Sequence, residues 1–282
     1  MVYEDVYQFS SEGTGGGPHP LPPEPPAMSS GGQSPPALYT ELLARSYDDL
    51  YRALRDPAGD VAFYVGLARE IGGPVLELGC GTGRVLLPIA DTGVACVGLD
   101  ASPAMLDVLR GKQPPPNLEL ALGRMETFAL GDARFRLAIS PFRALQHLLD
   151  VDSQLAALAN VRRHLAPGGT FAFDVFDPKL DRIAVADEAE HLSATFTHGG
   201  RQVRRWDAVR RDLTTQVMRV KFRFEADCVD LGATEVSLRW FYRYELQHLL
   251  ARAGFTDVTV YGGYDRRPWR AEGETVVVAR AP

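Results

Sequence analysis

Cysteine is scarce in this sequence of 282 residues, and three cysteines, Cys80, Cys96 and Cys228, cannot form a paired disulfide framework. None of them stands in a Cys-x-x-Cys pattern, and the six histidines lack the spacing of metal ligands. The sequence therefore favours a reducing, cytoplasmic location and predicts no metal site.

Long apolar runs and an excess of basic residues are also missing. No run is long enough to cross a membrane, and the N-terminus lacks the basic start and apolar centre of a signal peptide. The net charge of −6 gives no sign of a surface that neutralises nucleic-acid phosphates. We therefore expect neither a membrane nor a nucleic acid as partner. At 45% hydrophobic residues, the chain can bury the core of one enzyme-sized α/β domain.

Residues 1–36 have a composition unlike the rest of the chain. Gly, Pro and Ser dominate from Ser10 to Pro36, and such a stretch cannot bury enough surface to offset its ordering entropy. We expect a disordered tail; the alternative is a proline-rich ligand, although no Pro-x-x-Pro with a flanking anchor stands out. Apolar residues then recur at helical spacing, which predicts a helical cap over residues 37–73.

The most informative motif is a glycine-rich turn after an apolar run. Pro74 to Leu78 is typical of a buried strand, and the apolar positions from Val85 to Ala90 are typical of a helix. Between them lie three glycines, Gly79, Gly81 and Gly83. Lacking Cβ atoms, they let a ligand approach the main chain beside the unpaired N–H groups of a helix N-terminus. The motif predicts a nucleotide-binding turn.

Spacing narrows the choice of nucleotide. A dinucleotide fingerprint needs its third glycine at position 84, where this chain has Arg84, so a nicotinamide oxidoreductase is disfavoured. The next apolar strand, Ala95 to Leu99, ends in Asp100, whose carboxylate can accept both hydroxyls of a ribose. An unphosphorylated ribose suits this pattern.

The phrase Glu-x-Gly-x-Gly-x-Gly followed by a strand that ends in an acid resembles class I S-adenosylmethionine (SAM) dependent methyltransferases. Further motifs follow in that family's order from about Tyr39 to the C-terminus. The resemblance implies an α/β fold with a Rossmann-like, seven-stranded, mostly parallel sheet and helices on both faces. Residues 74–178 would form the SAM-binding core, and residues 242–282 would add a helix and the last two strands.

An antiparallel insertion is expected after the fifth strand, over residues 179–241. Residues alternate in strand fashion over 201–208, 214–226 and 235–242. The chain is similar here to the aminosugar N,N-dimethyltransferases, in which a β-layer covers the acceptor site. A homodimer interface is the alternative role of the insertion, and the two roles are compatible.

The resemblance implies a set of SAM-binding residues. Glu77 would orient the SAM ammonium or its water, and the loop after strand two would lie beside the ribose and adenine. Many relatives carry Asp where this chain has Arg124, so main-chain contacts are expected at the adenine edge. The implied set is Glu77, Gly79, Cys80, Gly81, Gly83, Asp100, Ala101, Ser102, Met105, Arg124, Met125, Glu126, Ser140, Pro141 and Phe142.

Two residues are candidates for catalysis on the same resemblance. A histidine at the place of His147 lies near the acceptor amine in the aminosugar enzymes, where a neutral imidazole takes a proton or orients a lone pair. A histidine that caps a helix or is satisfied by the backbone is the alternative. Tyr47 would hydrogen-bond the methionyl carboxylate or the acceptor, or else pack with its hydroxyl at the surface. Asp174 would touch the acceptor or cap a loop.

The expected function is methyl transfer from SAM to a small-molecule acceptor, leaving S-adenosyl-L-homocysteine, with nitrogen favoured over oxygen as the methylated atom. Base methylation is not expected, because the paired prolines of base-modifying enzymes are absent after Ser140. Protein or RNA methylation and a non-catalytic SAM-binding protein remain alternatives.

Overall fold

The computed structural model describes residues 41–54, 58–270 and 274–282. The tail predicted for residues 1–36 and the first four residues of the predicted helical cap lie outside the described residues. The cap itself contains two helices, α1 (Glu41–Leu54) and α2 (Ala58–Ile71).

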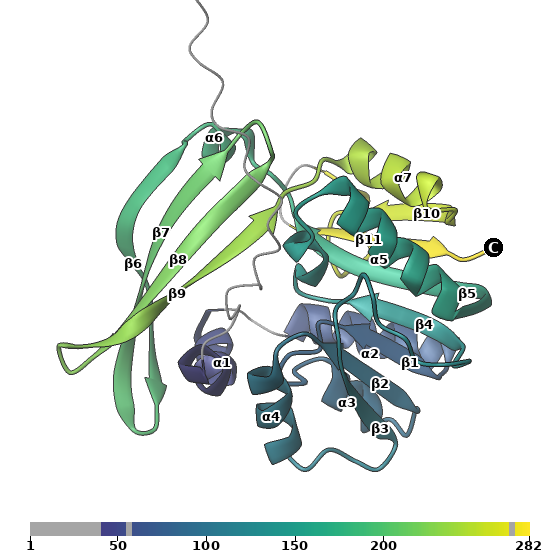
Figure 1. Ribbon diagram of the computed structural model, residues 1–282, viewed down its shortest axis with the longest axis horizontal. Coiled ribbons are helices and arrows are strands. Elements are labelled where there is room, and N and C mark those ends of the chain that lie inside the picture. The colour runs from purple at the N-terminus through teal and green to yellow at the C-terminus, as the bar shows by residue number, and fades with distance from the viewer. Residues whose placement is uncertain (1–40, 55–57, 271–273) are drawn as a thin grey trace, which may run out of the picture. The chain divides into compact units, whose positions relative to one another are not determined.

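Seven of the described strands form one sheet in the order β10-β11-β5-β4-β1-β2-β3 (Figure 1). Strands β1 to β5 run parallel, and β11 lies antiparallel to both β5 and β10. The predicted seven-stranded, mostly parallel sheet is therefore confirmed. The strands are β1 (Val75–Leu78), β2 (Cys96–Asp100), β3 (Leu118–Leu122), β4 (Phe135–Ser140), β5 (Leu165–Phe176), β10 (Thr256–Tyr261) and β11 (Glu274–Arg280).

Helices cover both faces of this sheet because its central strands carry apolar side chains on both sides. On one face, Phe171 and Phe173 of β5 pack with α5 and α7. On the other, Ala172 of β5 packs with α2, α3 and α4. Besides α1 and α2, the helices are α3 (Leu86–Ala90), α4 (Pro103–Gly111), the 3-10 turn η1 (Ala144–His147), α5 (Val151–His164), α6 (Leu180–Ile183) and α7 (Arg243–Arg252).

Helix α4 begins with a capped first turn. Ser102 is the N-cap, its hydroxyl accepts a hydrogen bond from the Met105 amide at 3.3 Å, and Pro103 is the first helical residue. This cap holds the loop after β2 in place beside the glycine turn.

The insertion after β5 is a separate antiparallel sheet in the order β6-β7-β8-β9, as Figure 1 shows. The strands are β6 (Asp187–His198), β7 (Arg201–Asp212), β8 (Val217–Ala226) and β9 (Val229–Arg239). The sequence prediction missed β6, because this edge strand begins with exposed charged residues and shows apolar alternation only near its end. One face of the sheet packs against α1, where Leu43 and Leu50 meet Phe196 and Phe224.

Hydropathy gives no membrane-crossing candidate: none of the helices in the described ranges combines the required length with a sufficiently apolar sequence.

Candidate functional site

The glycine turn follows directly from β1 and is held closely by its neighbours. Gly79 has a φ of +73°, its amide donates to the Leu99 carbonyl at 2.8 Å, and an added Cβ would lie 2.7 Å from the Ala144 Cβ. At Gly83, with a φ of +83°, a Cβ would lie 2.4 Å from Leu109. Both positions require glycine, for backbone conformation as well as for space. The turn is thereby fixed with its main chain accessible.

Ten residues line a cleft around this turn, which we call the glycine cleft. They come from the ends of β1 and β4, the glycine turn and helix α1, which agrees with ligand binding at the carboxyl ends of strands in open α/β sheets. The lining residues are Tyr47, Glu77, Gly79, Cys80, Gly81, Thr82, Arg84, Val85, Pro141 and Phe142. Seven of these ten were predicted from the sequence; Thr82, Arg84 and Val85 were not.

Glu77 is the most unusual group in the glycine cleft. Glu77 is 2% exposed, and its Oε2 atom has no hydrogen-bond partner among the residues that the structure describes. Burial raises the pKa of Glu77 well above its usual range, although Arg84 nearby acts in the opposite direction. A buried carboxylate that lacks a partner is costly, so the cleft fits a ligand that brings a cation or a donor to this atom.

Asp100 links the glycine turn to the loop after β2. Its Oδ2 accepts the Gly81 amide at 2.7 Å, and its Oδ1 accepts the Ser102 amide at 2.8 Å. Burial raises the pKa of Asp100, while these amides lower it. Each carboxylate oxygen has two lone pairs, so acceptor sites remain for ribose hydroxyls.

Arg84 was noted from the sequence only as the residue that replaces a glycine. In the structure its Nη1 and Nη2 donate to Oδ1 and Oδ2 of the buried Asp60 at 3.1 and 2.6 Å. Its guanidinium lies 5.1 Å from the centre of the Phe142 ring. Burial acts to lower the pKa of Arg84, but the bonds to Asp60 outweigh it, so the pKa is raised. A fixed positive charge therefore borders the cleft. The sequence signal that could have identified this residue is an arginine at the end of a glycine turn.

Helix α1 is tied to the glycine turn by charged contacts. The Thr82 hydroxyl donates to Asp48 at 2.7 Å, and Lys112 contacts the same carboxylate at 2.5 Å. One turn of α1 thus carries Tyr47 to the cleft. The chemical role of Tyr47 stays a prediction.

Three aromatic rings continue from the cleft toward the β insertion. The ring centres of Tyr47 and Tyr51 are 4.4 Å apart, and those of Tyr51 and Phe142 are 4.7 Å apart in an edge-to-face contact. We call Tyr47, Tyr51 and Phe142 the aromatic wall.

Asp174 caps the loop after β4. Its Oδ1 accepts the Tyr64 hydroxyl at 2.7 Å and the Phe142 amide at 2.9 Å, and its Oδ2 accepts the Arg143 amide at 3.2 Å. Burial, and then the charge of Glu274, raises the pKa of Asp174 to about 6. Of the two roles expected for Asp174, these contacts support the capping role.

His147 ends η1 and is not among the residues that line the glycine cleft. Its ring hydrogen-bonds the backbone of Ser237 in β9, and burial lowers its pKa to about 4. These contacts favour the alternative of a backbone-satisfied histidine, and the catalytic role stays an untested prediction. The adjacent Gln146 is fully buried: its side-chain amide donates to the Arg239 carbonyl and accepts from the Phe176 amide.

The other predicted SAM-binding residues surround the turn without lining the glycine cleft. Gly83 packs on Leu109, and Met105 and Ser140 are buried. Arg124 is half-exposed and forms an ion pair with Glu126 at 2.6 Å. The Met125 carbonyl accepts from Asn160, and Ala101 is exposed. Their cofactor contacts stay predictions. Within the described residues, no group of three or more potential ligands is arranged to hold a metal ion.

A family model described as "Methyltransferase domain" matches residues 75–169, which begin at β1 and contain the glycine turn. A curated relative from a Streptomyces species, "Cypemycin N-terminal methyltransferase", is 26% identical over 255 residues. That match covers 87% of this chain and 98% of the relative.

Solved structures extend the similarity over most of the chain. The CcbJ methyltransferase from Streptomyces caelestis is 30% identical with a TM-score of 0.68, covering 81% of this chain and 97% of that one. SAM-bound CalS10, an amino pentose methyltransferase from Micromonospora echinaspora involved in calicheamicin biosynthesis, is 28% identical with a TM-score of 0.62. It covers 87% of this chain and 98% of CalS10, so the similarity reaches well beyond the glycine turn.

Proposed function

Since this chain belongs to the class I SAM-dependent methyltransferases that act on small molecules, we propose that the atom it methylates is an amine nitrogen. Two relatives support this choice, because one is named as an N-terminal methyltransferase and the other as an amino pentose methyltransferase. The observation that supports the cofactor in this proposal is the glycine cleft, where charged groups of both signs border a half-buried main-chain turn.

Three charged residues would hold the cofactor. The unpartnered Oε2 of Glu77 would accept the SAM ammonium, and Arg84, fixed by Asp60, would take the methionyl carboxylate. Asp100 would accept the ribose hydroxyls with the lone pairs left by its amide contacts. In this arrangement each charged end of the methionyl group faces a side chain of the opposite charge.

SAM supplies a methyl group activated by a sulfonium. A neutral amine forms the new N–C bond with its lone pair while the S–C bond breaks, and the bonding pair stays on sulfur as S-adenosyl-L-homocysteine leaves. The methylated nitrogen then loses its proton to solvent. The chain needs chiefly to orient the reactants, which is worth roughly 7–11 kcal/mol of barrier. Tyr47, Tyr51 and Phe142 of the aromatic wall would exclude water beside the acceptor.

The β insertion would cover the acceptor site. Its buried face packs on α1, the helix that also supplies Tyr47 and Tyr51. A homodimer through the insertion is a separate proposal, and sedimentation of the purified chain tests it.

Transfer of labelled methyl from SAM into separate pools of amines, alcohols, thiols and peptides tests the proposed function. We expect label in the amine pool, with N-methyl signals in the NMR spectrum of the product. Glu77→Gln should weaken SAM binding, whereas Glu119→Gln on the exposed side of β3 is the matched control. If the products show O-methyl signals alone, the choice of nitrogen is contradicted. If the protein binds SAM but transfers label to none of the pools, the proposal that it methylates a small molecule is contradicted.

A further inference from the structure

An ion pair is buried on the inner face of the β insertion. Arg205 and Asp207 stand two residues apart on β7, and each is 8% exposed. Nε of Arg205 donates to Oδ1 of Asp207 at 2.7 Å, and Nη2 contacts Oδ2 at 2.5 Å. Their neighbour on the same face is the buried Val203, as strand alternation requires.

Stability does not explain this pair. Removing two charges from water is costly, and replacing a buried ion pair by well-packed apolar residues is often neutral or stabilising. The surrounding face is apolar, with Phe196, Phe224 and Val220 all buried. A charged pair at this place therefore calls for a functional reason.

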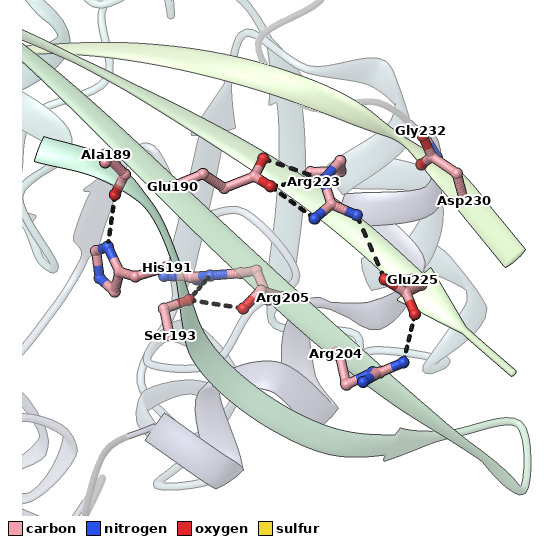
Figure 2. Close-up of polar contacts among 10 residues, drawn as sticks. All are labelled: Ala189, Glu190, His191, Ser193, Arg204, Arg205, Arg223, Glu225, Asp230 and Gly232. Atoms are coloured by element: carbon pink, nitrogen blue, oxygen red, sulfur yellow. Dashed lines mark hydrogen bonds and ion pairs between the residues drawn. The ribbon is translucent and has the colours of Figure 1, made fainter. Parts of the chain in front are cut away.

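The contacts of Arg205 hold its guanidinium in one orientation. Nε also donates to the Ser193 hydroxyl (Figure 2), at a distance of 3.1 Å. The guanidinium lies 4.4 Å from the centre of the Phe222 ring. Because Nε and Nη2 face Asp207, the Nη1 side of the planar fork points away from that carboxylate. Arg205 also acts on the Tyr51 hydroxyl: burial raises the pKa of that group, and the guanidinium charge acts to lower it.

Tyr51 connects this pair to the glycine cleft. Its ring contacts both Tyr47 and Phe142, which line the cleft. A second guanidinium, that of Arg143, also acts on the Tyr51 hydroxyl and is paired with Glu274 at 2.8 Å. One aromatic ring therefore separates the buried ion pair from the cleft in which SAM would bind.

We propose that Arg205 binds an anionic group of the acceptor, so that the acceptor is a small amine that also carries a carboxylate or a phosphate. Asp207 is the positioning residue that orients the guanidinium, and Tyr51 supports it from α1. A guanidinium fork matches the geometry of both anions. The short distance from Tyr51 to the cleft requires that amine and anion lie a few bonds apart. This inference rests on the proposed amine methylation.

Matched pairs of probes test the inference and show whether the bound anion is a carboxylate or a phosphate. L-Alanine is compared with L-alaninamide, and glucosamine 6-phosphate with glucosamine, in methyl transfer from labelled SAM. We expect the anionic member of at least one pair to have a kcat/KM about tenfold higher, the effect of one charge-assisted contact. The pair that shows the preference identifies carboxylate or phosphate as the anion.

Variants then assign the preference to Arg205. In Arg205→Gln, the preference for the anionic probe should disappear, chiefly through a higher KM, while calorimetric SAM affinity stays unchanged. Asp207→Asn should raise KM for the anionic probe and leave KM for the uncharged probe unchanged, a split that a general loss of structure would not produce. The double variant Arg205→Leu/Asp207→Leu removes both charges together, so it should fold and also lose the preference.

Arg223 offers the control on the opposite face of the same sheet. It pairs with Trp206 across β7 and β8, lies 5.2 Å from the Trp206 ring and bonds Glu190 and Glu225. Figure 2 shows this network, which continues from Glu225 to Arg204. Arg223→Gln removes a similar stacked and paired arginine, and we expect it to leave the probe preference unchanged.

The outcomes separate this inference from the proposed function. Methylation of uncharged amines at a rate equal to or above that of the anionic probes would overturn the inference and leave amine methylation standing. Retention of the preference in a folded Arg205→Gln variant would also overturn it. Label only in alcohols, despite intact SAM binding, would overturn both.

Discussion

The Tyr64 hydroxyl donates to Asp174 Oδ1 at 2.7 Å. The same carboxylate accepts the Phe142 amide, so it connects helix α2 to the loop that carries Phe142. Phe142 and Arg143 both have left-handed backbones, with φ of 56° and 66°. Such a conformation costs of order 1–3 kcal/mol for each non-glycine residue unless its surroundings hold it in place. The two amide bonds to Asp174 do so, and they set the position of Phe142 beside the glycine cleft.

Asp174→Asn should therefore slow methyl transfer more than it weakens SAM binding. An asparagine keeps one acceptor oxygen but turns an N–H group toward a backbone amide, which leaves a buried donor unsatisfied at a cost of about 1–3 kcal/mol. We expect a lower unfolding temperature and a lower kcat, measured by thermal denaturation and labelled methyl transfer. Tyr64→Phe keeps the carboxylate and both amide bonds, so its kcat should fall less. Equal kcat in Asp174→Asn and wild type would contradict the capping role.

The pH dependence of stability should carry a contribution from Asp174. Its pKa is raised from 3.8 to about 6 in the folded protein, so folding favours the protonated carboxyl. The stabilisation it provides is complete below about pH 4 and is lost as the pH rises to about 6, by roughly 3 kcal/mol for a shift of two units. Denaturant unfolding at a series of pH values should show this fall in wild type. If the prediction were wrong, the difference in free energy of unfolding between wild type and Asp174→Asn would stay constant between about pH 4 and pH 6.

SAM binding should release a proton from Glu77. Burial raises the pKa of this carboxyl, and an ammonium placed against Oε2 would favour its ionised form. Titration calorimetry in two buffers of different ionisation enthalpy measures that proton, and Glu77→Gln should abolish its release. The variant should also lose SAM affinity by one charge-assisted hydrogen bond, about 1.5–3 kcal/mol. Identical proton release in wild type and variant would place the titrating group elsewhere.

His147→Ala should affect stability more than catalysis. The imidazole is held against Ser237 of β9, and with a pKa of about 4 it is neutral at physiological pH. We expect a lower unfolding temperature, with methyl transfer kept within about tenfold of wild type, because a general base is worth about 100-fold or more. A larger loss of kcat at an unchanged unfolding temperature would instead establish His147 as a catalytic residue.

Sequence patterns predicted the elements of the sheet because each depends on a short stretch of chain. The apolar run at β1 and the glycines after it are local signals of backbone conformation. Sequence patterns did not predict edge strand β6, because its exposed first half, from Asp187, has no buried face that would require apolar and polar residues to alternate. The lining of the glycine cleft was predicted only in part: Tyr47, Pro141 and Phe142 came from the family resemblance, whereas Thr82, Arg84 and Val85, within and just after the turn, were missed.

By itself, the sequence determined the order along the chain of the seven strands of the main sheet, the glycine turn at Gly79 and the acid at the end of β2. Only the tertiary structure decided that Arg84 pairs with Asp60, that Tyr64 meets Asp174 across 110 residues, and that Arg205 lies buried near Tyr51. The physical reason is that turns and strands follow from steric limits and polarity within a few neighbouring residues. Ion pairs and buried hydrogen bonds depend on which faces of distant elements pack together, and the pattern within one segment does not contain that information.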